Sequence, residues 1–215
     1  MNTSRRAFLL QSLAIASLGY SFPAFAQQKS NSKISKTTPA PIPTLPLSIA
    51  IALENNEPVR NNDWIDAQIA EAEALFSLCG LHFNKAQSRT IDSRYARLET
   101  RKDRDALKDE MLKGHINVMV VNSLRDVDDP SLFRMGVHWR PQRDLKKHYI
   151  IVAASAMPTT LAHELGHFFG NGHSAVKNNV MSYDRDGGKV FFDAAQQTKI
   201  KNFARIYLQS KEITP

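Results

Sequence analysis

Short apolar runs separated by polar turns predict a set of strands in this chain. Leu47–Leu53, Ile116–Val121 and Tyr149–Ala153 are nearly continuous apolar runs of strand length, as expected for strands buried on both faces. Leu81–Asn84 predicts a shorter strand. Met135–Trp139 mixes apolar and polar residues and predicts a strand at the edge of the sheet.

Apolar residues spaced three and four positions apart predict helices between these strands. A first helix is capped by Asn62 or Asp63 and ended by Gly80. The charged segment 101–113 predicts a second, amphipathic helix, and residues 193–208 predict a last one. No internal repeat is visible, so the pattern favours one domain.

The N-terminal segment, residues 1–26, has the layout of a secretory signal peptide. Arg5 and Arg6 precede an apolar stretch, and Ala24 and Ala26 supply a small-residue cleavage site. The adjacent arginines resemble a bacterial twin-arginine export signal, with a general secretory signal as the alternative. The apolar stretch is interrupted and short for a membrane span, so no stable membrane insertion is expected after cleavage. We therefore expect export to the periplasm or secretion.

Residues 27–45 are rich in Ser, Lys, Thr and Pro, a composition typical of a flexible to extended linker. The remaining residues, 46–215, are enough for one domain with a buried core. Cys79 is the one cysteine and cannot form an internal disulfide, so the core must stabilise this domain. We expect Cys79 to be a small buried residue at the end of the first helix.

The charge of the chain points to no nucleic-acid partner. Its formal net charge is +7, and a mild positive charge favours acidic partners or anionic surfaces. The Lys and Arg residues are dispersed and are not interleaved with aromatic residues, so no nucleic-acid site is predicted.

The chemistry of the chain is concentrated in one motif, H-E-L-G-H-F-F-G-N-G-H. On a helix, His163 and His167 project from the same face and can bind one Zn²⁺ ion together. Glu164 then lies beside the metal without ligating it, which suits a general base acting on zinc-bound water. Gly170 can adopt a positive φ, so the helix can stop and the chain can turn back to bring His173 to the third ligand position. The fourth position stays open for water, which is typical of a catalytic zinc site.

This motif and the segment Asn178–Tyr183 that follows it resemble the metzincin clan of zinc endopeptidases. The resemblance implies that Met181 forms an apolar floor beneath the zinc ligands. It also implies that Tyr183 is a switchable fifth ligand, which swings away to hydrogen-bond the tetrahedral intermediate. Tyr183 after Met181 is similar to serralysin-like members, whereas Ser174 is common in matrixin-like members, so the branch stays open.

The resemblance implies an α+β fold: a metzincin-like catalytic domain with a twisted mixed sheet, backing helices, the zinc-site helix, the methionine turn and a C-terminal helix. The edge strand would line the upper rim of the cleft, which makes Gly136, Val137 and His138 candidate substrate-binding residues. A specificity pocket is expected beside the zinc, shaped by residues 184–192 and the start of the last helix. Residues 27–45 contain no Cys or Asp that would cap the zinc as a propeptide does, so control of activity is not predicted.

Other candidate metal ligands are weaker. Carboxylates at Asp126, Asp128 and Asp129, and at Asp184 and Asp186, are chemically suited to a structural Ca²⁺ ion, but solvated loops explain them more simply. Calcium is therefore not indicated. No ligand spacing links the remaining histidines to one another, and we expect them to face solvent or to be hydrogen-bonded: His82, His115, His138 and His148.

The sequence thus predicts a zinc-dependent endopeptidase that acts on a peptide or protein substrate. Glu164 would take a proton from the water and pass it to the leaving amine. Two alternatives use the same fold and metal. One is an exported adaptor that binds zinc without proteolysis, against which the intact Glu164 argues. The other is a zinc amidase acting on cell-wall peptides. The pattern specifies neither the cleavage specificity nor the oligomeric state.

Overall fold

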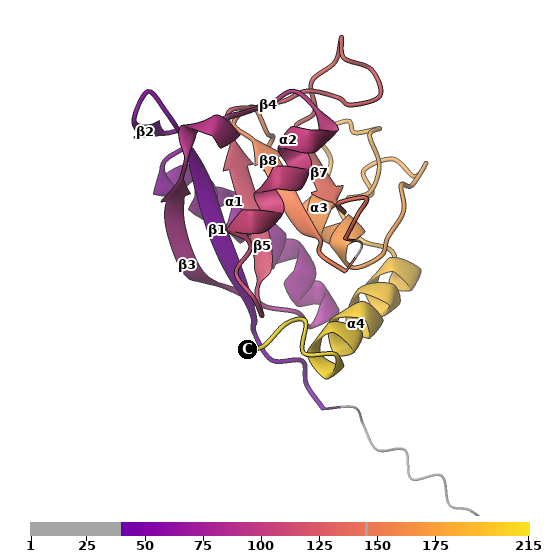
Figure 1. Ribbon diagram of the computed structural model, residues 1–215. Coiled ribbons are helices and arrows are strands. Elements are labelled where there is room, and N and C mark those ends of the chain that lie inside the picture. Colours follow the sequence, from indigo (N-terminus) through magenta and orange to yellow (C-terminus); the bar gives the residue numbers. More distant parts are fainter. Residues whose placement is uncertain (1–39, 145) are drawn as a thin grey trace, which may run out of the picture. The chain divides into compact units, whose positions relative to one another are not determined.

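A computed structural model describes residues 40–144 and 146–215 of the chain (Figure 1). The strands are β1 (Leu45–Glu54), β2 (Glu57–Pro58), β3 (Phe83–Ile91), β4 (Arg97–Leu98), β5 (Ile116–Val121), β6 (Ser123–Leu124), β7 (Gly136–Trp139) and β8 (Tyr149–Ala153). The helices are α1 (Asn62–Phe76), α2 (Arg101–Ala106), α3 (Thr160–Phe168) and α4 (Ala194–Gln209), with 3₁₀ turns at Ser77–Cys79, Ser93–Tyr95 and Leu107–Glu110. This mixture of strands and helices confirms the predicted α+β class.

The main sheet is mixed, as predicted. Strands β3, β1, β5 and β8 lie side by side and run parallel, while β7 pairs antiparallel with β8. The short β2 pairs antiparallel with the end of β1. Within the described part of the chain, β7 has β8 as its one neighbour in the sheet, so the predicted edge strand is confirmed.

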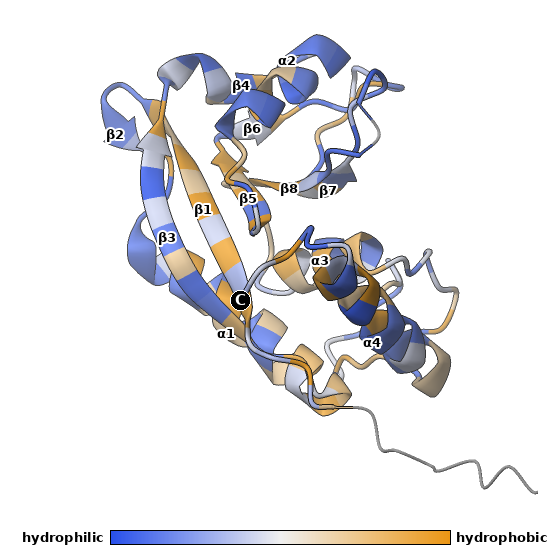
Figure 2. Ribbon diagram, turned by 60° about the horizontal axis from the view of Figure 1, so that its bottom comes forward, coloured by the Kyte–Doolittle hydropathy of each residue, from blue (hydrophilic) through white to orange (hydrophobic). Residues whose placement is uncertain are grey.

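The central strands are buried on both faces, which explains their nearly continuous apolar sequences. On one face, residues such as Ile49, Val118 and Ile150 belong to a core that α1, α3 and α4 complete. On the other face, residues such as Met119 and Ile151 belong to a second core, covered by α2 and the segments around it. Figure 2 shows α2 on one side of the sheet and α1, α3 and α4 on the other.

Strand β3 is longer than the sequence predicted. Its apolar start was expected to end at Asn84, but the strand continues to Ile91. The residues between them are mostly exposed, because β3 pairs with β1 alone and leaves its other edge to solvent. Figure 2 shows this strand as largely hydrophilic. An exposed strand needs no apolar alternation, so the pattern could not reveal its full length.

The helices differ from the prediction at their ends. Helix α1 is capped by Asn61, whose side chain accepts a hydrogen bond from the backbone N–H of Trp64 at 3.1 Å, so Asn62 and Asp63 are not the cap. Gly80 closes the turn after α1 with a φ of 68°, as predicted. The helix predicted at 101–113 is wrong in length: α2 ends after two turns and a 3₁₀ turn follows it.

The predicted signal peptide and most of the predicted linker lie outside the described residues. Strand β1 begins at the fully buried Leu45, the last residue that the sequence assigned to the linker. Cys79 is buried just after α1, and burial raises the pKa of its thiol to about 11. In residues 40–144 and 146–215, no helix combines the length and hydrophobicity that a membrane crossing requires.

Candidate active site

Helix α3 carries the first two histidines of the motif. Leu161, Leu165 and Phe168 bury one side of the helix in the core. His163 and His167, one turn apart, therefore share the face that looks away from this core, with ring centroids 4.7 Å apart.

The end of α3 turns the chain back toward these histidines. Gly170 has a φ of 82°, and its N–H donates to the His167 carbonyl at 2.9 Å, while the N–H of Asn171 donates to the Gly166 carbonyl at 2.9 Å. This pair of bonds is a Schellman motif, which needs the left-handed residue that glycine supplies. A Cβ at position 170 would also lie 2.5 Å from the Phe203 ring. Both the turn and its packing therefore require glycine.

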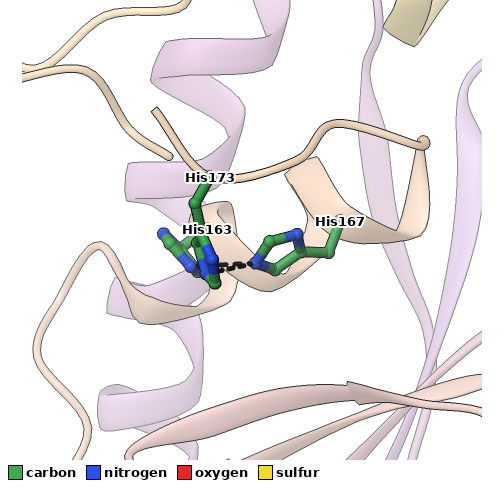
Figure 3. Close-up of side chains that lie close together, drawn as sticks. All are labelled: His163, His167 and His173. Atoms are coloured by element: carbon green, nitrogen blue, oxygen red, sulfur yellow. Dashed lines mark hydrogen bonds between the residues drawn. The ribbon is translucent and has the colours of Figure 1, made fainter. Parts of the chain in front are cut away.

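The three histidines meet at one point (Figure 3). The Nε2 atom of His167 lies 3.1 Å from that of His163 and 3.1 Å from that of His173. Backbone carbonyls hold the other ring nitrogens: Nδ1 of His163 faces the Val180 oxygen at 2.7 Å, and Nδ1 of His167 faces the Asn171 oxygen at 2.8 Å. The carbonyls can only accept, so in the neutral rings the proton sits on Nδ1 and the Nε2 lone pairs face one another.

This donor set fits a bound cation. Burial lowers the pKa of His163 to about 4 and also lowers the pKa of His167, so both rings are neutral at pH 7. Zn²⁺ sites typically have converging imidazole nitrogens as ligands, with backbone carbonyls accepting from the other ring nitrogens. Among the described residues, His163, His167 and His173 form the one group of three or more His, Cys, Asp or Glu side chains close enough to hold a metal.

Glu164 is buried beside this cluster, with an exposed fraction of 5%. Burial raises the pKa of its carboxyl to about 8, although a hydrogen bond from the backbone of His138 favours the charged form. Strand β7 lies so close that a Cβ at Gly136 would be 2.8 Å from Glu164 Cγ and 2.9 Å from Oε1. Gly136 therefore permits the approach of the edge strand to this carboxylate.

The methionine turn lies directly under α3. Met181 is fully buried, and a Cβ at Gly166 would overlap its sulfur. The Met181 carbonyl accepts a hydrogen bond from the backbone N–H of Ser174 at 2.9 Å, which ties the turn to the residue after His173. The structure thus places Met181 against α3 at Gly166, the residue before His167.

Tyr183 lies beside the cluster on the exposed side of the site. Its side chain is 74% exposed, and its hydroxyl lies 2.8 Å from Nε2 of His173. Burial of the hydroxyl end raises the pKa of the phenol. Tyr183 thus points a neutral O–H at the cluster from a side chain with room to move.

The cluster lies where two cavities meet. A cleft of about 720 Å³ is lined by the predicted edge residues Gly136, Val137 and His138, together with His167 and His173. A second cavity of about 510 Å³ lies against His163. Four residues line both cavities: Arg134, Gly136, Glu164 and Tyr183.

The predicted specificity segment contributes less than expected. Of residues 184–192, Arg185 alone lines either cavity. Helix α4 contributes Phe203 and Tyr207 to the larger cleft, from its second half rather than from its start.

The other acidic residues and histidines have local partners. The Asp126 carboxylate accepts hydrogen bonds from two backbone N–H groups and from Arg134, and Asp186 accepts from Asn178 and Gly188. His138 lies at the cleft with its Nε2 2.7 Å from Nδ1 of His148, which in turn contacts Glu212. Sequence spacing gave no sign of this pair, because the ten-residue separation brings the two rings together only when β7 pairs with β8.

Several residues that shape the site were not predicted. No role was predicted for Gly166, which lies inside the motif. The absence of a side chain at this position was the signal that could have indicated a close contact there. Asn179 is fully buried and donates to and accepts from the Gln196 side chain, and its oxygen also accepts from the Met181 N–H at 2.9 Å. Nothing in the sequence except its positive charge marked Arg185 as a residue of the site.

Comparison with known proteins agrees with this fold. No protein-family model matches the chain, and no curated protein matches its sequence. Mature mirolysin from Tannerella forsythia, solved in complex with a cleaved peptide, has a TM-score of 0.57 and 13% identity, over 82% of this chain and 100% of that one. Metalloproteinase-II from Bacteroides fragilis has a TM-score of 0.51 and 14% identity, over 74% of this chain and 53% of that one. At such identities the likeness shows the fold alone, and it confirms the predicted metzincin-like fold.

Proposed function

We propose that this chain is a zinc-dependent endopeptidase. The observation that carries the proposal is the convergence of three imidazole Nε2 atoms beside a buried carboxylate, where two cavities meet. His163, His167 and His173 would hold the ion. Zinc bound there supplies a Lewis acid that lowers the pKa of a water and polarises a peptide carbonyl.

Glu164 is the general base of this proposal. Burial raises the pKa of the metal-free carboxyl to about 8, and a Zn²⁺ ion bound beside it would favour the charged form, which can accept a proton. The backbone N–H of His138 and the close strand at Gly136 hold the carboxyl in place. Glu164 therefore takes a proton from the attacking water and delivers it to the leaving amine.

Tyr183 and strand β7 serve the substrate. The Tyr183 hydroxyl, 2.8 Å from Nε2 of His173, would donate a hydrogen bond to the oxygen that gains charge as the carbonyl is attacked. Strand β7 pairs with β8 on one side, so an extended peptide can add to its other side as a further strand. The cleaved peptide in the mirolysin structure is consistent with such a substrate.

The test is digestion of a random peptide library by the purified protein, with and without a chelator. We expect cleavage that a chelator abolishes and added Zn²⁺ restores. Glu164→Gln should keep its zinc and lose activity by about 10²–10⁴-fold. Glu71→Gln, which removes an exposed carboxylate on α1, is the matched control and should behave as the wild type.

Each other outcome is informative. A zinc-loaded wild type that cleaves no peptide would favour the adaptor, and release of peptides from purified cell wall alone would favour the amidase. Normal activity in Glu164→Gln would contradict the mechanism.

We also propose that residues 1–26 direct export by the twin-arginine route. Support comes from the Arg5–Arg6 pair, the apolar stretch after it and the Ala-x-Ala site. Conversion of both arginines to Lys should trap the precursor in the cytoplasm in cell fractionation. Continued export of that variant would favour the general secretory route.

A further inference from the structure

The cavity against His163 has an apolar rim that the described chain leaves uncovered. Phe133, Met135, Met157 and Tyr183 line it, and their exposed fractions range from 40% to 74%. Exposed apolar side chains gathered around one cavity of about 510 Å³ favour a ligand that covers them. Because Glu164 also lines this cavity, such a ligand would lie next to the reacting bond.

Arg185 places a positive charge in this apolar cavity. Its Nη2 donates to the Val180 carbonyl at 2.8 Å, its Nε to the Ser182 carbonyl at 3.3 Å, and its Nη1 to the Thr159 hydroxyl. These acceptors are all neutral, and no carboxylate of the described residues lies within ion-pair distance of the guanidinium. Three of its five N–H groups are used, which leaves two for a ligand.

The surroundings of Arg185 add to the positive charge. Thr159 is the N-cap of α3, and the first turn of this helix contains no acidic residue. A helix N-terminus carries a partial positive charge, so Arg185 is held beside a second positive group. Burial lowers the pKa of Arg185, yet the guanidinium remains charged at any physiological pH. Among the described residues that line the cavity, Glu164 is the one acid.

We propose that Arg185 makes this cavity a pocket for a carboxylate of the substrate, so that the enzyme cleaves next to an acidic residue. The carboxylate would take the two remaining N–H groups of the guanidinium, and the methylenes of a Glu side chain would contact Met135 and Met157. The inference rests on the proposed peptidase function, because it assigns the residue that fills a pocket beside Glu164. A free C-terminal carboxylate has the same chemistry and is the other source to be tested.

The experiment uses peptide libraries that are random except for one central residue, Glu in one and Gln in the other, with a C-terminal amide. Mass spectrometry of the wild-type digest should place most cuts next to the fixed Glu, with kcat/KM roughly ten- to hundredfold above the Gln library. Arg185→Gln should reduce cleavage of the Glu library to the level of the Gln library. Lys189→Gln, an exposed charge in the same segment, is the matched control and should keep the preference.

Two results would overturn the proposal. One is a wild type that cleaves both libraries equally. The other is an Arg185→Gln variant that loses activity on both libraries alike while it retains zinc, because Arg185 would then serve only to hold Val180, Ser182 and Thr159 together. A free C-terminal carboxylate is the other possible ligand of the pocket. If peptides with a free C-terminal acid are cut near their C-termini, and the same peptides with a C-terminal amide are not, the pocket binds the terminal carboxylate instead.

A binding measurement separates this inference from the proposed function. Glu164→Gln retains every other side chain of the cavity, so its affinity for the two amide libraries can be compared by fluorescence anisotropy without cleavage. A preference for Glu that Arg185→Gln removes would support the pocket even if no peptide were cut. Equal affinities would contradict it whether or not peptides are cleaved.

Discussion

The contact between Gly166 and Met181 offers a sharp test of how the methionine turn supports the histidine helix. A Cβ at position 166 would overlap the Met181 sulfur, and would lie 3.2 Å from Met181 Cε and 3.4 Å from Phe192 Cε1. Met181 is fully buried, so its side chain cannot move into solvent to make room. Gly166→Ala therefore overpacks the core below the ligands.

The expected cost follows from two opposing effects. Overpacking of a well-packed core costs about 1–3 kcal/mol, whereas Ala is more favourable than Gly inside a helix by about 0.5–1 kcal/mol. The difference between the two ranges is about 0–2.5 kcal/mol, and the overlap with the Met181 sulfur puts the net loss in the free energy of unfolding in its upper part, roughly 1–2 kcal/mol. For a domain of this size, that loss lowers Tm by about 3–6 °C.

The assay is thermal unfolding of the metal-free protein, arranged as a double-mutant cycle with Met181→Ala. Met181→Ala alone should cost about 2–5 kcal/mol through the cavity it leaves. The double variant should lose less than the sum of the single losses, because the new methyl group occupies part of that cavity. Gly172→Ala is the matched control, since a Cβ there meets no atom within 4 Å. Unchanged stability in Gly166→Ala, or strictly additive losses in the cycle, would refute this packing.

Other predictions concern Glu164 and the turn. Burial raises the pKa of Glu164 from 4.5 to about 8, so folding takes up a proton and the metal-free wild type loses stability as pH rises through this interval. In urea unfolding at pH 8, the free energy of unfolding of metal-free Glu164→Gln should exceed that of the wild type by up to roughly 5 kcal/mol, whereas at pH 4 it should not. Equal stability of the two proteins at both pH values would contradict the burial of a charge. Gly136→Ala should lower kcat/KM about tenfold or more with zinc retained, because its methyl group displaces the Glu164 carboxyl, and full activity would contradict that contact. Asn179→Ala should lower the free energy of unfolding by about 2–4 kcal/mol in the same assay, because it leaves the buried Met181 N–H and the Gln196 amide without hydrogen-bond partners. A loss below about 0.5 kcal/mol would contradict this role.

The convergence of the three histidines was predictable because their geometry is local. A helix sets the relation of His163 to His167, and a glycine with a positive φ returns the chain within six residues to His173. Backbone carbonyls of Val180 and Asn171 fix the orientation of the His163 and His167 rings. A short motif can therefore encode almost the whole arrangement of these three histidines.

The shape of the site was less predictable, because it depends on segments far apart in the chain. Gly136 approaches Glu164 only after β7 joins the sheet, and Arg185 reaches Thr159 only after the methionine turn folds under α3. The same reasoning explains why the predicted length of β3 was wrong. The extent of this strand depends on its pairing with β1 along an exposed edge and not on its own hydrophobicity. Neither the composition of the chain nor the spacing of its residues reveals contacts between segments so far apart in the sequence.

The most direct test of the central claim is a zinc titration of the metal-free protein in which bound zinc and peptide cleavage are measured in the same samples. We expect cleavage to be absent without metal, to rise in proportion to bound zinc and to reach its plateau at about one ion per chain, the capacity of one three-histidine catalytic site. Cleavage that does not depend on zinc, or one bound zinc with no cleavage of any peptide, would contradict the central claim.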